Sequence, residues 1–507
     1  MRIIDIKLPR AVSAILRITP ITPRAQQLKQ LKKLLTKAAN TKFGQQYKFA
    51  EILASKHIGK AYQALVPIHD YNTMYQNWWQ QTLTGDGDVT WPGHYPYYAL
   101  SSGTSDAASK HIPISNDMLR SHKLNMAKQY VSLLTYKNLP LNAVGKSMLM
   151  IGGTTELQQS KYGWQAGDLS GIMAKTKPFW IEGTYKPGRK VAAIKDWNKK
   201  LEKIVEDAPN WDIGFVVGVP AWCQLCIEKI IERYNLTTIH DLWPNFGFFV
   251  HGGVAFTPYK KSFEAVCAKP ITYIENYLSS EGFIGYVDRQ HAKGIKLITN
   301  NWLFLEFVPF TEVNFDEDGN IKPCAKALMI HEVSLGKEYA LLMSTNSGAW
   351  RYLIGDTIKF VDVEKCEIII TGRTKSFLSL VGEHLSVDNM NNAIKHACDT
   401  LNISIPEYTV VGVPEGSFFA HHWYVACDQV VSDKDLLTLI DKQLCKINDD
   451  YLVERESALK NVYITILPVS TFLGFMASKG KLGSQHKFPR VLKGKVLQEW
   501  ITFLTSA

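Results

Sequence analysis

A stretch of small polar residues follows Leu100 and reads SSGTS, with Lys110 a few residues downstream. Hydroxyls, closely spaced backbone N–H groups and one ammonium suit phosphate oxygens, because a loop of small residues lets several donors converge on one anion. The stretch is not a Walker A loop, since GxxxxGK[ST] is absent from the chain. The pattern is typical of a phosphate-binding loop or of an ordinary turn.

A second polar stretch, YLSSEG at 277–282, follows an apolar run at 271–276 that we expect to be a buried strand. The carboxylate of Glu281 could hold a Mg²⁺ ion that bridges to phosphate oxygens. The alternative is the beginning of a helix, in which Ser279 and Ser280 cap the first turn and Glu281 is its acid.

A third stretch, RYLIGD at 351–356, predicts a Gly-Asp turn between two strands. The carboxylate of Asp356 could accept hydrogen bonds from both hydroxyls of a ribose, and the alternative is a plain hairpin turn. Downstream, Thr371-Gly372-Arg373 resembles a hinge at the edge of a smaller unit.

The segment 478–495 carries six Lys or Arg and no acid, and Gly480 and Gly483 favour a mobile loop in its first part. Such a loop could deliver one lysine to a developing negative charge. The alternative is a solvated basic tail.

The elements that would position these residues alternate between short apolar strands and helices. Strands are expected near 148–151, 215–219, 248–250 and 271–276, each ending in Gly or polar residues, with helices at 118–136 and 220–233. This alternation predicts a parallel α/β sheet with ligand loops at the carboxyl ends of its strands. A denser β region follows at 303–370, and from about 385 the order helix, strand, strand, helix, strand predicts a small α+β unit.

Length and composition predict a soluble globular protein of about two to four structural units. The chain has 507 residues and a net charge of +10, and a chain of this length buries a core without disulfides or metals. Residues 1–48 hold eleven Lys or Arg against one acid, Asp5, and thus the whole excess. Within them 24–40 predicts a helix whose apolar face is Leu28, Leu31, Leu35 and Ala38. We favour a packed helix with a solvated basic side over a transit peptide or a membrane-surface segment.

The eight cysteines are sparse and irregular, and Cys223-x-x-Cys226 has no second pair to complete a zinc site. Free thiols suit a reducing cytoplasm, where we expect the protein to reside. The chain contains no run of about 20 apolar residues, which is the length that a membrane-spanning helix needs. We also expect a monomer that binds no nucleic acid.

The motifs are weak singly, but their order is specific. A Ser/Thr/Gly loop, YxSSE, a YxxGD-like stretch, GR and a lysine loop follow one another as in the adenylate-forming superfamily, and the details resemble the GH3 family of acyl acid–amido synthetases. SSGTSxxxxK (101–110), YxSSE (277–281) and RYLIGD (351–356) resemble its three nucleotide motifs. Further segments that resemble GH3 family sequences lie at 40–49, 218–222, 242–253, 304–309 and 485–490.

The resemblance implies a role for each matching residue. Glu281 would help to hold Mg²⁺, Asp356 would bind the ribose hydroxyls of ATP, Arg373 would assist near the hinge, and Lys487 would stabilise charge during adenylation. The remaining nucleotide contacts would come from Ser101, Ser102, Thr104, Ser105, Lys110, Tyr277, Ser279, Ser280 and Phe304. Among them Tyr277 and Phe304 would lie near the adenine, and the family often has Tyr where Phe304 stands.

The resemblance also implies a large N-terminal α/β adenylation domain (1–380) and a smaller, mobile C-terminal α+β domain (381–507). With ATP and Mg²⁺ the enzyme would convert a carboxylic acid to acyl-AMP and then transfer the acyl group to an amine, expected to be an amino acid. One alternative is an acyl-CoA synthetase that shares the first step. Another is a catalytically impaired nucleotide-binding module, because Asp106-Ala107 and His384 depart from the plant pattern.

Overall fold

The structure is a computed structural model. The residues it describes, with gaps between the ranges, are 22–101, 110–137, 139–253, 256–316, 319–374, 378, 385, 387–415, 418–448, 451–452, 455, 459, 461–480 and 488–506.

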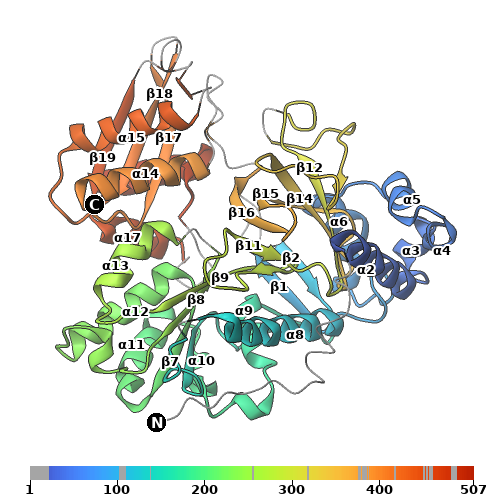
Figure 1. The fold of residues 1–507 in the computed structure, drawn as a ribbon, viewed down its shortest axis with the longest axis horizontal. Coiled ribbons are helices and arrows are strands. Elements are labelled where there is room, and N and C mark those ends of the chain that lie inside the picture. The colour runs from blue at the N-terminus through green and yellow to red at the C-terminus, as the bar shows by residue number, and fades with distance from the viewer. Residues whose placement is uncertain are drawn as a thin grey trace.

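A mixed sheet of twelve strands, ordered β13-β12-β14-β15-β16-β11-β10-β9-β8-β7-β3-β6, forms the centre of the N-terminal part (Figure 1). Its parallel half confirms the strands expected from the apolar runs. The parallel strands are β3 (Ser147–Ile151), β6 (Tyr185–Lys186), β7 (Ile213–Gly218), β8 (Phe248–Gly252) and β9 (Thr272–Ser279). The antiparallel strands are β10 (Gly282–Tyr286), β11 (Ile295–Leu297), β12 (Leu303–Pro309), β13 (Leu328–Met329), β14 (Glu338–Thr345), β15 (Tyr352–Asp362) and β16 (Glu367–Arg373).

Helices pack beside the parallel half, and their ends follow local rules. Helix α12 (Pro220–Arg233) starts with proline at its first position, where the missing N–H costs no hydrogen bond. Helix α11 (Trp197–Asp207) is capped by Asp196, whose carboxylate accepts the Lys199 N–H at 2.8 Å. Cys223 and Cys226 are fully buried on α12. The smaller helices of this half are α9 (Leu169–Lys175), α10 (Arg189–Ala192) and α13 (Lys260–Ala265), with the 3-10 turns η3 (Phe179–Ile181), η4 (Ala208–Asn210), η5 (Ile239–Asp241) and η6 (Thr257–Tyr259).

The predicted N-terminal helix is present as α2 (Pro23–Ala38), capped by Thr22. Its apolar side is buried against the antiparallel half, with Leu31 and Leu35 inaccessible to solvent, while Lys29 and Lys33 lie on the other side and are exposed. This confirms the packed helix with a solvated basic side. The elements that follow are α3 (Lys42–Gln46), α4 (Phe49–Ala54), α5 (Ile58–Leu65), α6 (Tyr71–Met74), the π-helical turn η1 (Tyr75–Trp79), α7 (Gln80–Leu83), and a four-stranded sheet of β1 (Tyr97–Ser101), β2 (Lys110–Ile114), β4 (Gln158–Gln159) and β5 (Gln165–Gly167).

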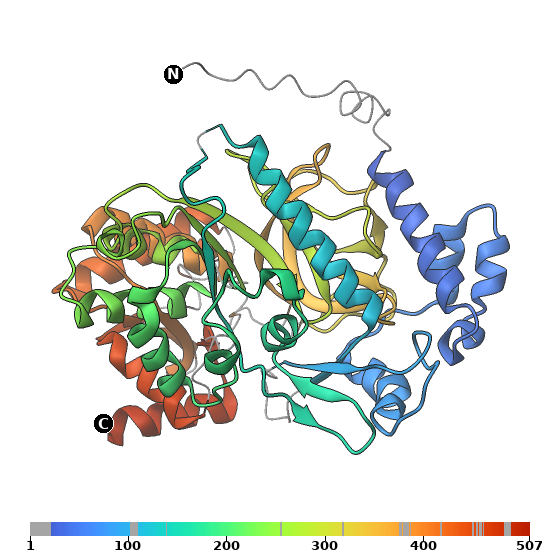
Figure 2. The same cartoon turned by 90° about the horizontal axis from the view of Figure 1, so that it is seen from below.

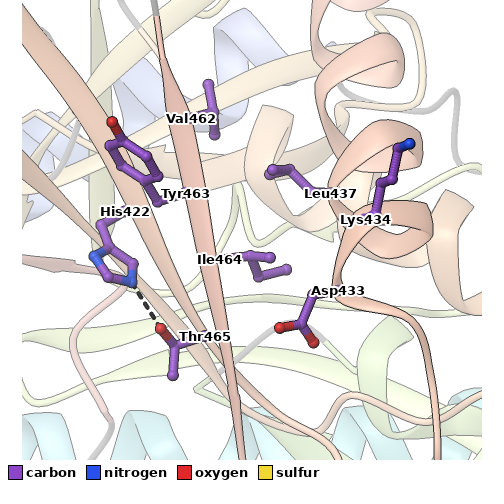
Figure 3. Close-up of a pocket in the computed structure, with 8 residues that line it drawn as sticks. All are labelled: His422, Asp433, Lys434, Leu437, Val462, Tyr463, Ile464 and Thr465. Carbon is purple, nitrogen blue, oxygen red and sulfur yellow. Dashed lines mark hydrogen bonds between the residues drawn. The ribbon is translucent and has the colours of Figure 1, made fainter.

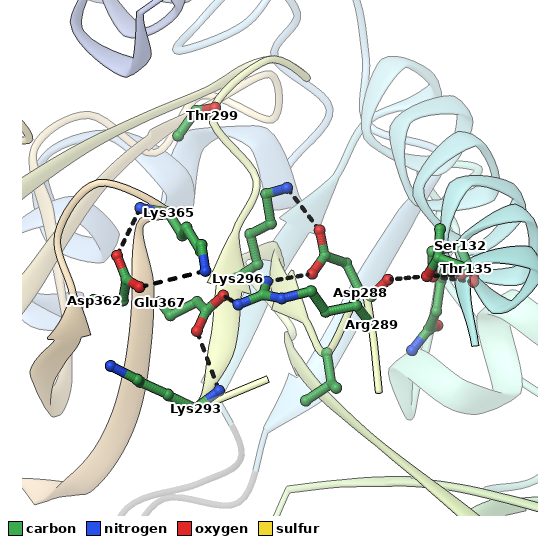
Figure 4. A network of polar contacts seen from close by, with 12 residues as sticks. Ser132, Thr135, Asp288, Arg289, Lys293, Lys296, Thr299, Asp362, Lys365 and Glu367 are labelled. Atoms are coloured by element: carbon green, nitrogen blue, oxygen red, sulfur yellow. Dashed lines mark hydrogen bonds and ion pairs between the residues drawn. The ribbon is translucent and has the colours of Figure 1, made fainter. Parts of the chain in front are cut away.

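Helix α8 (Asn116–Ser132), followed by the 3-10 turn η2 (Leu133–Thr135), crosses the face seen in Figure 2 and packs on β10. An ionic network anchors the loop between β10 and β11 beside it (Figure 4). Arg289 forms ion pairs with Asp288, at 3.0 Å, and with the fully buried Glu367 on β16. The hydroxyl of Thr135 donates to the Asp288 carbonyl at 3.2 Å, which fixes the end of η2 on this loop.

A smaller C-terminal unit has its own sheet, ordered β19-β18-β17-β20, and two core clusters. The expected order of helix, strand, strand, helix, strand is confirmed from residue 387 onward, while the boundary at 380 stays a prediction. Its elements are α14 (Val387–Leu401), β17 (Tyr408–Glu415), β18 (Phe418–Ala426), α15 (Asp433–Ile447), β19 (Val462–Leu467), α17 (Val469–Ser478), β20 (Val491–Leu492) and α18 (Gly494–Ser506). Among the described helices of the whole chain, none is long and apolar enough to cross a membrane.

Candidate functional site

The second motif forms a hairpin turn. Ser279 ends β9 and pairs with Gly282, the first residue of β10, so Ser280 and Glu281 make the turn between two antiparallel strands. The alternative of a helix beginning with serine caps is therefore wrong. The turn places the Glu281 side chain inward, and this residue is only 9% exposed.

The third motif lies inside a strand. Gly355 and Asp356 belong to β15, so the expectation of a Gly-Asp turn between two strands is wrong. Gly355 has φ +88°, a left-handed conformation that favours glycine. The register of β15 against β14 shifts between Ala340 and Leu342, opposite this glycine. Such a bulge redirects the next side chain, and here that side chain is Asp356.

Motif residues from three segments meet around Asp356. Its carboxylate accepts the Tyr277 phenol at 2.6 Å and the Arg373 Nε at 3.2 Å. The pairing of β15 with β16 sets Asp356 opposite Arg373, and the guanidinium also donates to the Ile354 carbonyl at 3.1 Å. These contacts join Tyr277, Asp356 and Arg373, whose distances from one another cannot be predicted from the sequence.

Glu281 belongs to the same cluster. It accepts a hydrogen bond from the phenol of Tyr352, which is almost fully buried. Burial raises the pKa of Glu281 and the charge of Asp356 adds to this, while the Tyr352 hydrogen bond and Arg373 oppose it. Sequence reasoning missed Tyr352 as a site residue, although it stands in the quoted RYLIGD motif directly ahead of the Gly-Asp pair.

Burial also raises the pKa values of the two phenols far above the ordinary tyrosine value, with the neighbouring carboxylates as the next cause. Tyr277 and Tyr352 are therefore permanent hydrogen-bond donors at neutral pH. The charge of Asp356 raises the pKa of Arg373, so this side chain stays cationic. The cluster thus holds two carboxylates, one guanidinium and two neutral phenols, and in the described part of the chain no group of three or more His, Cys, Asp or Glu could hold a metal ion.

Arg351 of the same motif points away from the cluster. Its Nε lies 3.1 Å from Glu306 Oε2, and both side chains are buried, exposed by only 6% and 1%. Its Nη1 donates to the carbonyls of Val66 at 2.7 Å and Gln63 at 3.0 Å. Arg351 thus ties α5 and the following loop to the antiparallel half, and it is a structural residue.

The base of the first motif lies beside this cluster. Ser101 ends β1 opposite Lys110 at the start of β2, and the Lys110 ammonium lies 5.1 Å from the centre of the Tyr71 ring. The Tyr71 hydroxyl accepts the His111 N–H at 2.9 Å. Tyr71 is also near enough to Tyr352 to contribute, after burial and Glu281, to its raised pKa. Ser102, Thr104 and Ser105 lie outside the described residues, as does Asp106-Ala107.

Two of the predicted site residues, Phe304 and Lys487, are not part of the cluster around Asp356 as the structure describes it. Phe304, on β12, is fully buried in the main core, with its ring edge-on to Tyr62 at 5.9 Å between centroids. Lys487 lies outside the described residues, and so does His384. The residue after Lys487, Phe488, packs its ring against Phe472 at 4.7 Å in the C-terminal core.

Arg490, three residues after Lys487, takes part in a contact between the two units. Its Nη1 lies 2.6 Å from Glu407 Oε2, and Glu407 Oε1 accepts the hydroxyl of Tyr259 at 2.6 Å. Tyr259 ends η6 in the N-terminal part. Beside it, Lys261 donates to the Cys398 carbonyl of α14 at 3.2 Å. The C-terminal unit therefore rests on η6 and α13 in this structure.

A hollow of about 430 Å³ lies on the C-terminal unit between α15 and β19 (Figure 3). One of its walls holds a hydrogen bond of 2.8 Å between His422 Nε2 and Thr465 Oγ1. Its lining residues are His422, Asp433, Lys434, Leu437, Val462, Tyr463, Ile464 and Thr465. None of the motif residues lines it, so it is separate from the cluster around Asp356.

Solved structures with this fold define its class. A GH3.15 acyl acid amido synthetase superposes with a TM-score of 0.76 and 16% identity, covering 100% of this chain and 97% of that one. A 2-hydroxyisobutyryl-CoA ligase in its postadenylation state superposes with a TM-score of 0.59 and 11% identity, covering 96% and 93%. The fold, with its large N-terminal and smaller C-terminal domain, is thus one that an acyl acid amido synthetase and an acyl-CoA ligase share.

Sequence profiles then identify the family. The GH3 family N-terminal, central and C-terminal domains match residues 19–205, 296–371 and 388–495. The chain belongs to the GH3 family, as its motifs predicted. Indole-3-acetic acid-amido synthetase GH3.4 of Arabidopsis thaliana is 23% identical over 239 residues, which are 42% of this chain and 38% of that protein. GH3.9 of the same plant is 27% identical over 194 residues, 33% of either chain, so these alignments span well under half of the curated relatives.

Proposed function

We propose that the protein is an ATP-dependent acyl acid–amido synthetase. In the first step a carboxylate oxygen of the acid attacks the α-phosphorus of ATP, and pyrophosphate leaves. In the second step an amine, in our proposal that of an amino acid, attacks the acyl carbon, so that an amide forms and AMP leaves. The observation that carries the proposal is the meeting of Tyr277 and Glu281, from one motif, with Asp356 and Arg373, from two others, in one cluster.

Each residue of the cluster has a task in this proposal. Asp356 binds the ribose hydroxyls, because Tyr277 and Arg373 fill only two of the roughly four positions at which a carboxylate accepts hydrogen bonds. Arg373 and Tyr277 hold that carboxylate in place. Glu281 is the residue that would hold Mg²⁺, with Tyr352 fixing its orientation. A Mg²⁺ ion bound there would neutralise charge on the phosphate oxygens.

The remaining predicted residues complete the site. The phosphates would lie on the loop that starts at Ser101, with Ser102, Thr104 and Ser105 as donors and Lys110 at its base. Ser279 and Ser280 directly precede Glu281 in its hairpin, and Phe304 would support the adenine side from the core. Lys487 would meet the charge that develops on the α-phosphate.

We further propose that the C-terminal domain, residues 381–507, rotates about the segment 374–388 between the two steps, so that Lys487 acts in the first step only. The contact of Tyr259 with Glu407 would then belong to one of the two arrangements. We place the reaction in the cytoplasm, because none of the eight cysteines, all among the described residues, forms a disulfide.

The test is pyrophosphate–ATP exchange over a panel of carboxylic acids, followed by mass spectrometry of the products formed with a panel of amino acids. Exchange with at least one acid, and an amide as the product, would support the proposal. Exchange with no acid would instead favour a nucleotide-binding module without catalysis.

The second candidate function is an acyl-CoA ligase, which the superposition on 2-hydroxyisobutyryl-CoA ligase over 96% of this chain favours. Both candidates share the adenylation step and differ only in the acceptor. Supplying coenzyme A and amino acids together distinguishes them, since a thioester product would establish the ligase and an amide would exclude it.

A further inference from the structure

Exposed apolar side chains gather on and after helix α8. Seventeen large apolar side chains are exposed in the described part of the chain, and seven of them fall between residues 124 and 144. They are Leu124, Met126, Tyr130, Val131, Leu134, Leu141 and Val144. Leu134 is 79% exposed and Val131 62%. Single exposed apolar residues are ordinary, but a concentration of this kind marks an interaction surface.

Basic side chains border this apolar surface. On α2, Lys29, Lys33 and Lys37 follow one another at intervals of four residues and so share one side of the helix. The Lys37 ammonium lies 3.3 Å from Asp117 at the start of α8, and that of Lys33 lies 5.6 Å from the centre of the Trp302 ring. In Figure 2 both helices are seen along their lengths, and the ion pair joins the end of α2 to the start of α8.

The sequence gives this surface a strong positive charge. The segments 23–38 and 116–144 together hold nine Lys or Arg and a single acid, Asp117. On α8 itself Arg120 is 81% exposed, and Lys128 donates to the Asn300 side chain at 3.1 Å beside Trp302. Cationic and aliphatic residues thus alternate along α8, and the segment around Trp302 touches both this helix and the lysine side of α2. We call the exposed residues of the two segments the α2–α8 face.

We propose that the α2–α8 face docks on membranes that contain anionic lipids. An apolar surface bordered by Lys and Arg is the pattern of proteins that lie on such membranes, because the aliphatic side chains enter the boundary of the acyl chains while the cations meet the headgroups. A single-stranded nucleic acid fits less well, since the two most exposed residues, Leu134 and Leu141, offer no aromatic plane for base stacking. A second copy of the chain also fits less well, because two faces of the same charge repel.

This proposal goes beyond the proposed function and does not depend on it. None of the motif residues lies on the α2–α8 face, so the two proposals concern different residues of the chain. A failure of the adenylation assay would leave the membrane proposal standing, and the reverse also holds.

The experiment is flotation of the full-length protein with two kinds of vesicle, one of phosphatidylcholine alone and one with about 30% phosphatidylglycerol. The anionic lipid gives the second kind a negative surface potential that attracts Lys and Arg. We expect binding to the anionic vesicles only, and a loss of binding when salt is raised to about 0.5 M, where charges are screened. No binding to anionic vesicles at low salt would overturn the proposal.

Two pairs of substitutions locate the surface. Lys29→Gln with Lys33→Gln is expected to weaken binding by about fivefold for each lysine removed. The matched control is Lys434→Gln with Lys442→Gln, two exposed lysines on α15, and it should bind as the unmodified protein does. Equal binding by the two double variants would show that charge alone, wherever it lies, explains the attraction, and would overturn the proposal.

The apolar part is tested without a change of charge. Val131→Ser with Leu134→Ser should weaken binding by roughly tenfold, because less apolar area is buried, whereas Leu335→Ser, at a site that is 64% exposed elsewhere, should have no effect. A thermal melt of each variant shows that it is folded. If Val131→Ser with Leu134→Ser left vesicle binding unchanged but dissociated an oligomer in sedimentation, the face would be an interface between copies and the proposal would be wrong.

Discussion

Replacement of Asp356 by alanine tests the central assignment of the site. The carboxylate has two hydrogen-bond donors, the Tyr277 phenol at 2.6 Å and the Arg373 Nε at 3.2 Å, and two acceptor positions remain for the ribose hydroxyls. A hydrogen bond to a charged acceptor contributes about 1.5–3 kcal/mol. Loss of two such bonds should weaken ATP binding by about 3 kcal/mol or more, which corresponds to roughly 150-fold.

The assay is calorimetric titration with ATP and with 2′,3′-dideoxy-ATP, which lacks both hydroxyls. The unmodified protein should bind ATP roughly a hundredfold more tightly than the dideoxy analogue. The Asp356→Ala variant should bind the two nucleotides almost equally, because the group that distinguishes them is gone. Tyr277→Phe, which keeps the carboxylate and removes one of its donors, should lose roughly tenfold at most.

A control on the same strand separates binding from folding. Asp362→Ala changes an acid at the far end of β15, where its partner is Lys365 at the strand turn, and ATP affinity should stay within about threefold of the unmodified value, as for other surface substitutions. The assignment of Asp356 would be refuted if its alanine variant still preferred ATP over the dideoxy analogue by the original factor.

Further predictions concern other parts of the site. Lys487→Ala should abolish pyrophosphate–ATP exchange while ATP affinity stays within about tenfold, a loss of transition-state stabilisation; equal exchange rates would contradict its role. Tyr352→Phe should raise the Mg²⁺ concentration needed for half-maximal nucleotide binding by about tenfold, because Glu281 loses a buried donor, and calorimetry without metal should give an unchanged ATP affinity. Glu306→Gln should lower the free energy of unfolding by about 3 kcal/mol, since the charge of Arg351 stays buried without its partner; urea denaturation measures this, and a large loss of ATP affinity in the folded variant would show that Arg351 serves the nucleotide instead.

The strands and helices of the fold were predictable because the apolar periodicity and the Gly and Pro residues at the boundaries indicate the same elements. The apolar run before Gly252 became β8, and Pro220 marked the start of α12 as expected. Ser279 and Ser280 left a helix start open as an alternative, because serine favours helix caps and turns alike. Only the pairing of Ser279 with Gly282 decides between them, and that pairing depends on strands distant in the sequence.

The site was predictable as a set of motifs but not as a geometry. Asp356 was assigned to a turn because Gly-Asp is a strong turn signal, whereas the glycine supplies the left-handed residue of a bulge inside a strand. Arg351 and Tyr352 are neighbours in the sequence, yet one is paired in the core with Glu306 and the other reaches Glu281. The role of each of these two residues depends on the partner that it meets on its side of the sheet. Both partners, Glu306 and Glu281, lie far from them in the sequence.

The contact of Tyr259 with Glu407 bears on how quickly such an enzyme could work. Glu407 and Arg490 both belong to the C-terminal unit and would move together, so a rotation of that unit would separate the pair from Tyr259. Separation costs one hydrogen bond to a charged acceptor, about 1.5–3 kcal/mol, enough to bias the two arrangements by about 10- to 150-fold. In the rotation that we propose, a substitution at position 259 would thus shift the balance between the two arrangements without touching any residue of the cluster around Asp356.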